Sequence, residues 1–162
     1  MGWRQSEGST VAARRADGDL VALDTSCLVA LVSSWHEHHA RTVESLERRL
    51  RAGAKIVVPA HALLEAYAVL TRLPAPNRLS PGDAIEVLRE NFEKNARTVS
   101  LDADEYWALL RAAPTAGLYG GRIYDAVIAA SVRKTKAREI LTWNLKHFES
   151  FADGTLVVAS PP

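Results

Sequence analysis

Short apolar runs alternate along this chain with longer segments of helical periodicity, and this alternation restricts the fold more than any other feature. Parallel strands need long crossover connections, which are commonly helical. The pattern therefore predicts an α/β protein, a three-layer α/β/α sandwich with a mainly parallel central sheet. The predicted strands are 20–23, 55–58, 97–101, 140–143 and 156–159.

The segments between these runs predict helices, several of them with recognisable ends. Ser80 followed by Pro81 is typical of a helix start, and Asp102 is expected to cap the helix that contains Tyr106. Proline and glycine mark other boundaries, as at Gly53 and Pro74. Besides the helix that Asp102 caps, the predicted helices cover 28–35, 38–52, 60–73, 81–95, 123–136 and 145–151.

The length of 162 residues fits one domain with a sizeable core. We expect residues 20–162 to form that domain and residues 1–19, which are polar and lack periodicity, to form a flexible N-terminal arm. No stretch approaches the ~20 apolar residues of a membrane span. The single Cys27 lies among apolar neighbours and is expected to be buried and inert. These features predict a cytoplasmic protein.

A formal charge of +1 neither indicates nor excludes a nucleic-acid partner. The basic residues are not evenly spread, because they gather in two stretches of the chain. Such stretches are most often solvated helix faces, but they are also able to bind phosphates. The first contains Arg41, Arg48, Arg49, Arg51 and Lys55, and the second contains Arg133, Lys134, Lys136 and Arg138.

Asp24, Glu65 and Asp125 each lie alone inside an apolar run. A single ionised carboxylate buried in such surroundings costs several kcal/mol unless a cation or strong hydrogen-bond donors compensate it. One divalent metal shared by the three acids would explain all of them. Taken singly, each acid would also suit a helix cap or a pair with a buried arginine, but this explanation is less favoured for all three together.

The predicted topology brings these acids to one edge of the sheet. Asp24 and Asn144 follow predicted strands, and Asp125 lies in the first turn of a helix. Glu65 lies one turn deeper in its helix, within side-chain reach of the same crevice. Oxygen ligands favour Mg²⁺ or Mn²⁺, which serve phosphodiester chemistry by activating water. The hydroxyl groups that we expect to orient the carboxylates belong to Thr25, Ser26 and Thr142.

Other polar and aromatic groups are weaker candidates. The histidines of 36–39 do not have the spacing of a zinc-protease site. Trp35, Tyr106 and Trp107 are expected in the core or at an interface. Asn144 suits a turn or helix cap as well as a ligand role, and Arg122 suits an ion pair with Asp125, a phosphate contact or a partner contact.

Four segments in order resemble the PIN-domain nucleases, and among them the VapC-type toxins of bacterial toxin–antitoxin pairs. The resemblance extends over roughly 20–159. One departure is Asn144, where the family often carries Asp. The four segments are Leu23-Asp24-Thr25-Ser26, Leu64-Glu65-Ala66, Arg122-Ile123-Tyr124-Asp125 after two glycines, and Thr142-Trp143-Asn144 before His147-Phe148.

The resemblance implies a metal-dependent endonuclease that cleaves single-stranded RNA and leaves a 5′-phosphate. It implies Mg²⁺ or Mn²⁺ held by Asp24, Glu65 and Asp125, with Asn144 as a further catalytic residue. It also implies inhibition by a small VapB-like antitoxin and assembly as a homodimer. Because a neutral amide binds metal more weakly than a carboxylate does, Asn144 leaves open whether one or two ions bind.

Two other functions remain open from the sequence. The first is a phosphohydrolase that uses Asp24 as a covalent nucleophile, a mechanism that would want a second Asp where Ser26 stands. The second is a non-catalytic PIN-like module that binds RNA or a protein partner. Trapping of a phosphoaspartate would identify the first, and RNA left intact by Mn²⁺-loaded protein would support the second.

Overall fold

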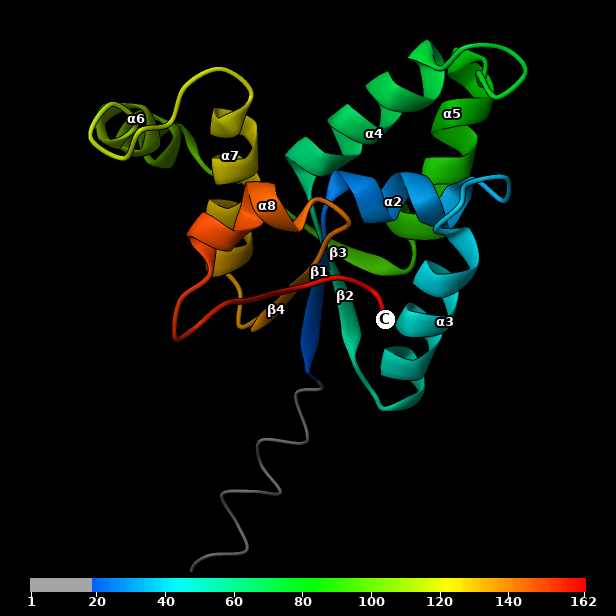
Figure 1. The fold of residues 1–162 in the computed structure, drawn as a ribbon, viewed down its shortest axis with the longest axis horizontal. Helices are drawn as coiled ribbons and strands as arrows, with labels where there is room; N and C mark the ends of the chain where they lie inside the picture. The colour runs from blue at the N-terminus through cyan, green and yellow to red at the C-terminus, as the bar shows by residue number, and fades with distance from the viewer. Residues whose placement is uncertain (1–18) are drawn as a thin grey trace, which may run out of the picture.

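The computed structural model describes residues 19–162 (Figure 1), so the predicted arm, apart from Asp19, lies outside the described residues. A five-stranded sheet forms the centre of the molecule, and its strand order is β3-β2-β1-β4-β5. All four strand pairs are parallel. The strands are β1 (Leu20–Leu23), β2 (Lys55–Pro59), β3 (Ala96–Val99), β4 (Glu139–Leu141) and β5 (Val157–Ala159).

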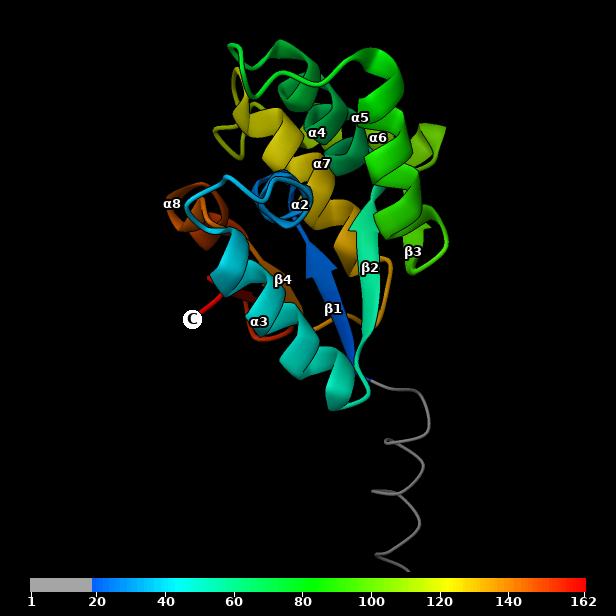
Figure 2. The same cartoon turned by 90° about the vertical axis from the view of Figure 1, so that its right-hand side faces the viewer.

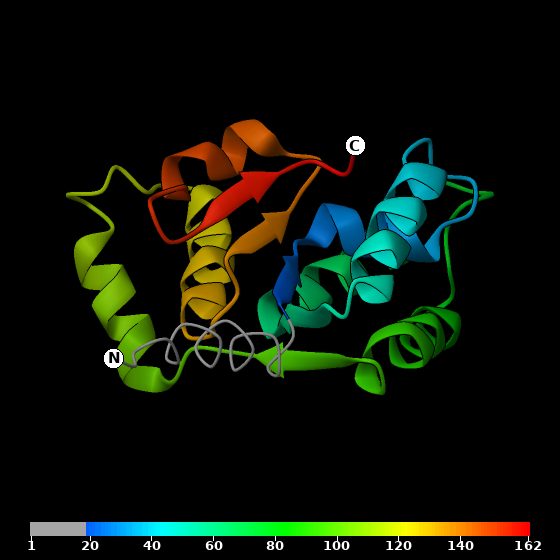
Figure 3. The same cartoon turned by 90° about the horizontal axis from the view of Figure 1, so that it is seen from below.

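Helices cover both faces of the sheet, which confirms the predicted three-layer sandwich. The chain leaves β1 in one direction along the sheet, reaches β3, and then crosses back to β4. Figure 3 accordingly shows α2, α3 and α5 on one side of the sheet and α6 and α7 on the other. The helices are α2 (Thr25–Val32), α3 (His39–Arg51), α4 (Ala60–Arg72), α5 (Pro81–Leu88), α6 (Ala103–Ala112), α7 (Arg122–Arg133) and α8 (Leu145–Phe148).

The central strands are buried on both faces, as parallel strands between two helical layers must be. Apart from the partly buried Leu20, the apolar side chains of β1 and β2 show almost no exposed surface, and neither do those of β4. Cys27 is buried among them as a free thiol, as predicted. Within residues 19–162, no helix is long and apolar enough to cross a membrane.

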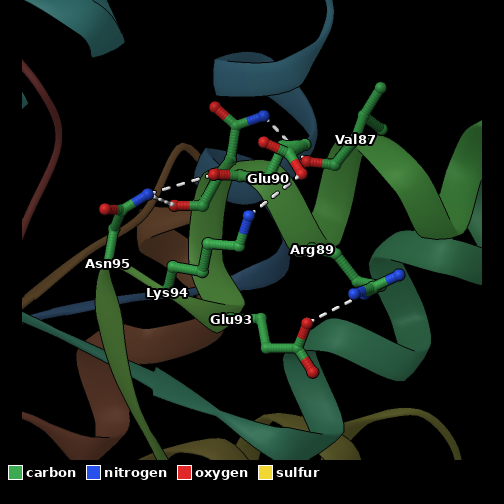
Figure 4. A network of polar contacts seen from close by, with 7 residues as sticks. Val87, Arg89, Glu90, Glu93, Lys94 and Asn95 are labelled. Carbon is green, nitrogen blue, oxygen red and sulfur yellow. Dashed lines mark hydrogen bonds and ion pairs between the residues drawn. The ribbon is translucent and has the colours of Figure 1, made fainter.

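The prediction of one regular helix over 81–95 is wrong at its end. The α-helix α5 stops at Leu88, and the chain goes on as a π-helical turn, Arg89–Glu93. Side chains hold this wider turn in place (Figure 4). The amide of Asn95 donates to the Glu90 carbonyl over 3.0 Å, and Lys94 pairs with the Glu90 carboxylate over 3.4 Å. Asparagine amides that bond backbone carbonyls compete with the regular helical pattern, and this explains the irregular end.

The fourth strand is also shorter than predicted, since it ends at Leu141 instead of Trp143. The backbone beyond it turns toward the carboxyl end of β1. The N–H of Trp143 donates to Ser26 Oγ over 2.8 Å, and the N–H of Asn144 donates to Thr142 Oγ1 over 2.9 Å. Hydroxyl groups therefore replace the strand partners of this segment and bring it to the candidate site.

Candidate active site

A cavity of about 730 Å³ lies beyond the carboxyl ends of the strands, where α2, α4, α7 and α8 meet. Figure 2 shows α2 directly beyond the end of β1. Ligands of open parallel sheets bind at this edge, because the loops and helix starts that follow the strands gather there. The structure brings to this cavity seven of the eight residues singled out from the sequence, namely Asp24, Thr25, Ser26, Glu65, Arg122, Asp125 and Asn144.

Asp24 is the most constrained of the three acids. Its side chain is almost fully buried, with the residue 2% exposed, and it caps α2 by accepting the N–H of Cys27 over 3.0 Å. The hydroxyls of Ser26 and Thr142 each donate to one carboxylate oxygen over 2.7 Å. Burial nevertheless raises the pKa of Asp24 from 3.8 to about 6; the three hydrogen bonds lower it, and the charge of Asp125 adds a smaller increase.

Glu65 reaches the cavity from the second turn of α4 and is partly buried. Thr25 Oγ1 donates to its carboxylate over 2.8 Å, so the first residue of α2 fixes the position of this acid. His61 lies one turn earlier on α4, with its Nε2 4.0 Å from Glu65 Oε1. That Nε2 is buried and has no hydrogen-bond partner among the described residues, while the imidazole stacks on Tyr124.

Asp125 lies in the first turn of α7 and is partly buried. Its carboxylate is 3.4 Å from Nδ1 of the exposed His147. Burial raises the pKa of Asp125, and the charge of Glu65 raises it further, whereas His147 and Arg122 lower it. The charges of Asp125 and Glu65 thus act on neighbouring acids, which means that the three carboxylates share one electrostatic environment.

Asn144 and Arg122 line the same cavity in different ways. Asn144 is exposed at the start of α8, and its side chain makes no capping hydrogen bond there. The guanidinium of Arg122 donates to Ser150 Oγ over 2.7 Å and lies 5.9 Å above the ring of Phe151. Arg122 therefore acts on Asp125 through its charge from a position held by the 149–151 turn.

Residues 36–38 form another wall of the cavity, and no metal-binding cluster is found there among residues 19–162. His38 stacks on Trp143 with ring centroids 3.8 Å apart, while His39 Nδ1 bonds the Ala30 carbonyl over 2.8 Å. These two imidazoles thus have separate structural partners. Trp143 donates from its ring nitrogen to Thr42 Oγ1 over 2.9 Å, so this wall is rigid.

The donor set fits a hard divalent cation. Carboxylate and amide oxygens face the cavity, and burial together with mutual repulsion raises the pKa of Asp24 and of Asp125, as expected where a cation would restore balance. Within residues 19–162, no three His, Cys, Asp or Glu side chains are close enough together to hold an ion as they stand.

His61, His147 and Trp143 were not singled out from the sequence as site residues. His61 precedes Glu65 by four residues, which places both on one helix face, so its position could have been read from spacing. His147 meets Asp125 only because α8 and α7 pack together, and no local pattern shows that contact.

Comparison of the sequence with known protein families identifies the family of this chain. The PIN domain family matches residues 21–153. Ribonuclease VapC40 of Mycobacterium tuberculosis is 35% identical over 132 residues, which is 82% of this chain and 92% of VapC40. The chain therefore belongs to the PIN-domain family, and within it to the VapC type.

Solved structures share the fold at low sequence identity. VapC20 of Mycobacterium tuberculosis, described as a sarcin-ricin loop cleaving toxin, superposes with a TM-score of 0.61 at 17% identity and covers 80% of this chain and 94% of its own. VapBC2 of Rickettsia felis, solved on a promoter DNA fragment, gives 0.61 at 19% identity over 87% and 98%. At these identities the likeness shows the fold.

Proposed function

We propose that the protein is a metal-dependent endoribonuclease, the toxin of a toxin–antitoxin pair, acting in the cytoplasm. The observation that carries this proposal is the convergence of Asp24, Glu65 and Asp125 on one cavity of a VapC-type PIN domain. These residues would hold Mg²⁺ or Mn²⁺. When bound, such an ion supplies an activated water and neutralises charge on the phosphate.

The chain's own residues fix the geometry of this site. The hydroxyls of Ser26 and Thr142 hold the Asp24 carboxylate, so its orientation is set before any ligand arrives. Thr25 does the same for Glu65, and the imidazole of His147 lies beside Asp125. Carboxylates that are oriented one by one in this way lose less side-chain freedom when they move together around a cation.

Asn144 and Arg122 complete the proposed site from the solvent side. The exposed amide of Asn144 is placed to orient water or to contact the phosphodiester as a neutral group. Arg122 is placed to contact a phosphate at the cavity wall, and its bond to Ser150 keeps the guanidinium near that wall. The contacts proposed for Asn144, with water or with the phosphodiester, do not require its side chain to carry a charge.

A covalent phosphohydrolase mechanism is less well supported. Asp24 is 2% exposed and three hydrogen bonds fix its carboxylate, whereas a covalent nucleophile must approach the phosphorus atom of a substrate closely enough to form a bond. Ser26, which stands where that mechanism wants a second acid, is instead a donor to Asp24. A non-catalytic module would not need three oriented carboxylates at one cavity.

We also propose that a VapB-like antitoxin and a second copy of the chain are partners. Apolar side chains left exposed on the helical layers support this assignment. Trp107 is 61% exposed and Leu110 is 50% exposed on α6, a helix without buried residues, and Leu64 is 69% exposed on α4. Isolated exposed apolar residues are ordinary, but adjacent large ones on one helix, such as Trp107 and Leu110 on α6, are typical of interaction surfaces.

Expression of wild type and Asp125→Asn, followed by sequencing of RNA 5′ ends, tests activity and target together. We expect new 5′ ends only with wild type. In vitro, Asp24→Asn, Glu65→Gln and Asp125→Asn should each lower cleavage by about 100-fold or more, as should EDTA. Glu86→Gln, which removes an exposed acid on α5, is the matched control. Cleavage at the full rate in EDTA would overturn the mechanism.

A further inference from the structure

A second cavity, of about 1310 Å³, lies at the opposite end of the sheet, where the strands begin. Figure 3 looks at the molecule from this end. The cavity is bounded by the starts of four neighbouring strands, β3, β2, β1 and β4, and by the segment between α7 and β4. We call it the basic groove, because its charged lining comprises Lys55, Lys94, Arg97, Lys134, Lys136 and Arg138 against Asp19 and Glu139.

Part of this charge is already balanced. Glu139 forms a two-pronged pair with Arg49, with N···O distances of 2.7 and 2.8 Å, so it is not available to the groove. Lys134 pairs with Glu105, and Lys94 pairs with Glu90. The pair of Lys94 is largely exposed, and pairs of that kind contribute little to stability and are easily exchanged for another anion.

Three of the basic side chains in the groove have no acidic partner among the described residues. Within residues 19–162, the side chains of Lys55, Arg97 and Arg138 make no hydrogen bond or ion pair, and all three are exposed. Asp19 is the only acid of the lining that lacks a cationic partner of its own among the described residues. The groove therefore presents a net positive surface, and the sheet fixes the spacing of its charges.

The spacing indicates the kind of anion that would fit. Lys55 begins β2, Arg97 lies near the start of β3, and Arg138 directly precedes β4. Neighbouring strands lie about 4.8 Å apart, so charges on β3 and β4, three strand spacings apart, are separated by about 14 Å. That span is too wide for a single phosphate and suits a chain of regularly spaced negative charges.

We propose that the basic groove binds the sugar–phosphate backbone of RNA at a distance from the cleavage site. The choice of RNA among polyanions rests on the proposed function, in which RNA is the substrate. The four residues of β1 separate the groove from Asp24 by about 13 Å through the core, so an RNA strand bound at both places would follow a longer path over the outside of the molecule. Contacts to phosphates add affinity without reading sequence.

The salt dependence of RNA binding tests this assignment. Binding of poly(U) is measured by fluorescence anisotropy at several salt concentrations, with all proteins carrying Asp125→Asn so that no RNA is consumed. The test protein adds Lys55→Gln, Arg97→Gln and Arg138→Gln. The control has the same charge change at exposed arginines outside the groove, Arg48→Gln, Arg72→Gln and Arg111→Gln. Thermal unfolding confirms that each variant is folded.

Each lost phosphate contact on a single strand lowers the slope of log affinity against log salt by about 0.7, so the groove variant should lose about 2 from its slope. Between 50 and 200 mM salt, its affinity should fall about 16-fold less than that of its parent. The control should keep the parent slope. Equal losses in both variants, or none in either, would overturn the proposal.

Two further outcomes distinguish RNA binding at the basic groove from an acidic-peptide site and from the proposed cleavage activity. Poly-glutamate that competes as well as poly(U) at equal charge would identify the groove as an acidic-peptide site and overturn the assignment to RNA. Wild type that fails to cleave any RNA would count against the proposed function. The slope is measured without cleavage, so it would still decide whether the groove binds RNA backbone.

Discussion

Asp24→Asn should make the metal-free protein more stable at neutral pH, although it alters a buried and hydrogen-bonded residue. Burial raises the pKa of Asp24 from 3.8 to about 6. Because one pKa unit is worth about 1.4 kcal/mol, ionised Asp24 disfavours the folded state by about 3 kcal/mol. Asparagine has a similar shape and still accepts the Cys27 N–H, so it removes the charge and keeps the cap.

The direction of the pH dependence follows from the raised pKa. Neutral Asp24 favours folding fully below pH ~4, where the unfolded chain also keeps the proton. This stability is lost as the pH rises through about 6, the folded pKa. Relative to wild type, Asp24→Asn should therefore gain about 3 kcal/mol between pH 4 and pH 7, whatever the other titrating groups contribute to both proteins.

Urea unfolding in EDTA, followed by tryptophan fluorescence at several pH values, measures this difference. A stability difference between the two proteins that stays constant from pH 4 to pH 7 would refute the reasoning. It would mean that the bonds from Ser26 and Thr142 compensate the carboxylate fully. With Mn²⁺ at about 100 times its Kd, wild type should regain about 2.7 kcal/mol at pH 7, and Asp24→Asn should regain little.

Two further substitutions follow from the same site. In EDTA, Asp125→Asn should leave the protein as stable as wild type or about 1 kcal/mol more stable, because it relieves repulsion from Glu65. It should also abolish most of the stabilisation by Mn²⁺ in a thermal melt. A loss of several kcal/mol in EDTA would instead make Asp125 a structural ion-pair partner. Thr142→Val removes a hydrogen-bond donor to buried Asp24 and should lower the free energy of unfolding by about 1–3 kcal/mol in urea at pH 7. The control, Thr155→Val at an exposed hydroxyl, should lower it less. Equal losses of stability would show that the Thr142 hydroxyl has no special role.

The surroundings of the large aromatic side chains could be predicted only in part from the sequence. Trp35, Tyr106 and Trp107 were expected in the core or at an interface, and all three are exposed in the chain by itself. Helical periodicity finds an apolar face but does not tell what covers that face. The interface alternative therefore remains for Trp107, and it is part of the partner proposal.

The sequence by itself determined the features that depend on local periodicity and on single residues. The alternation of apolar runs and helical segments predicts the parallel sheet. Ser80 and Asp102 cap the helices that they were expected to cap, the second with a complete capping box. The isolation of Asp24 among apolar neighbours predicts its burial. Each of these predictions rests on a pattern that lies within a few residues along the chain.

Only the tertiary structure decided which distant groups meet. His147 faces Asp125 because α8 packs on α7, and Thr142 reaches Asp24 because β4 pairs with β1. The basic groove likewise unites Lys55 from one charged stretch with Arg138 from the other. Strand order and register set these contacts, and they come from the packing of the whole core, which no local pattern in the sequence records.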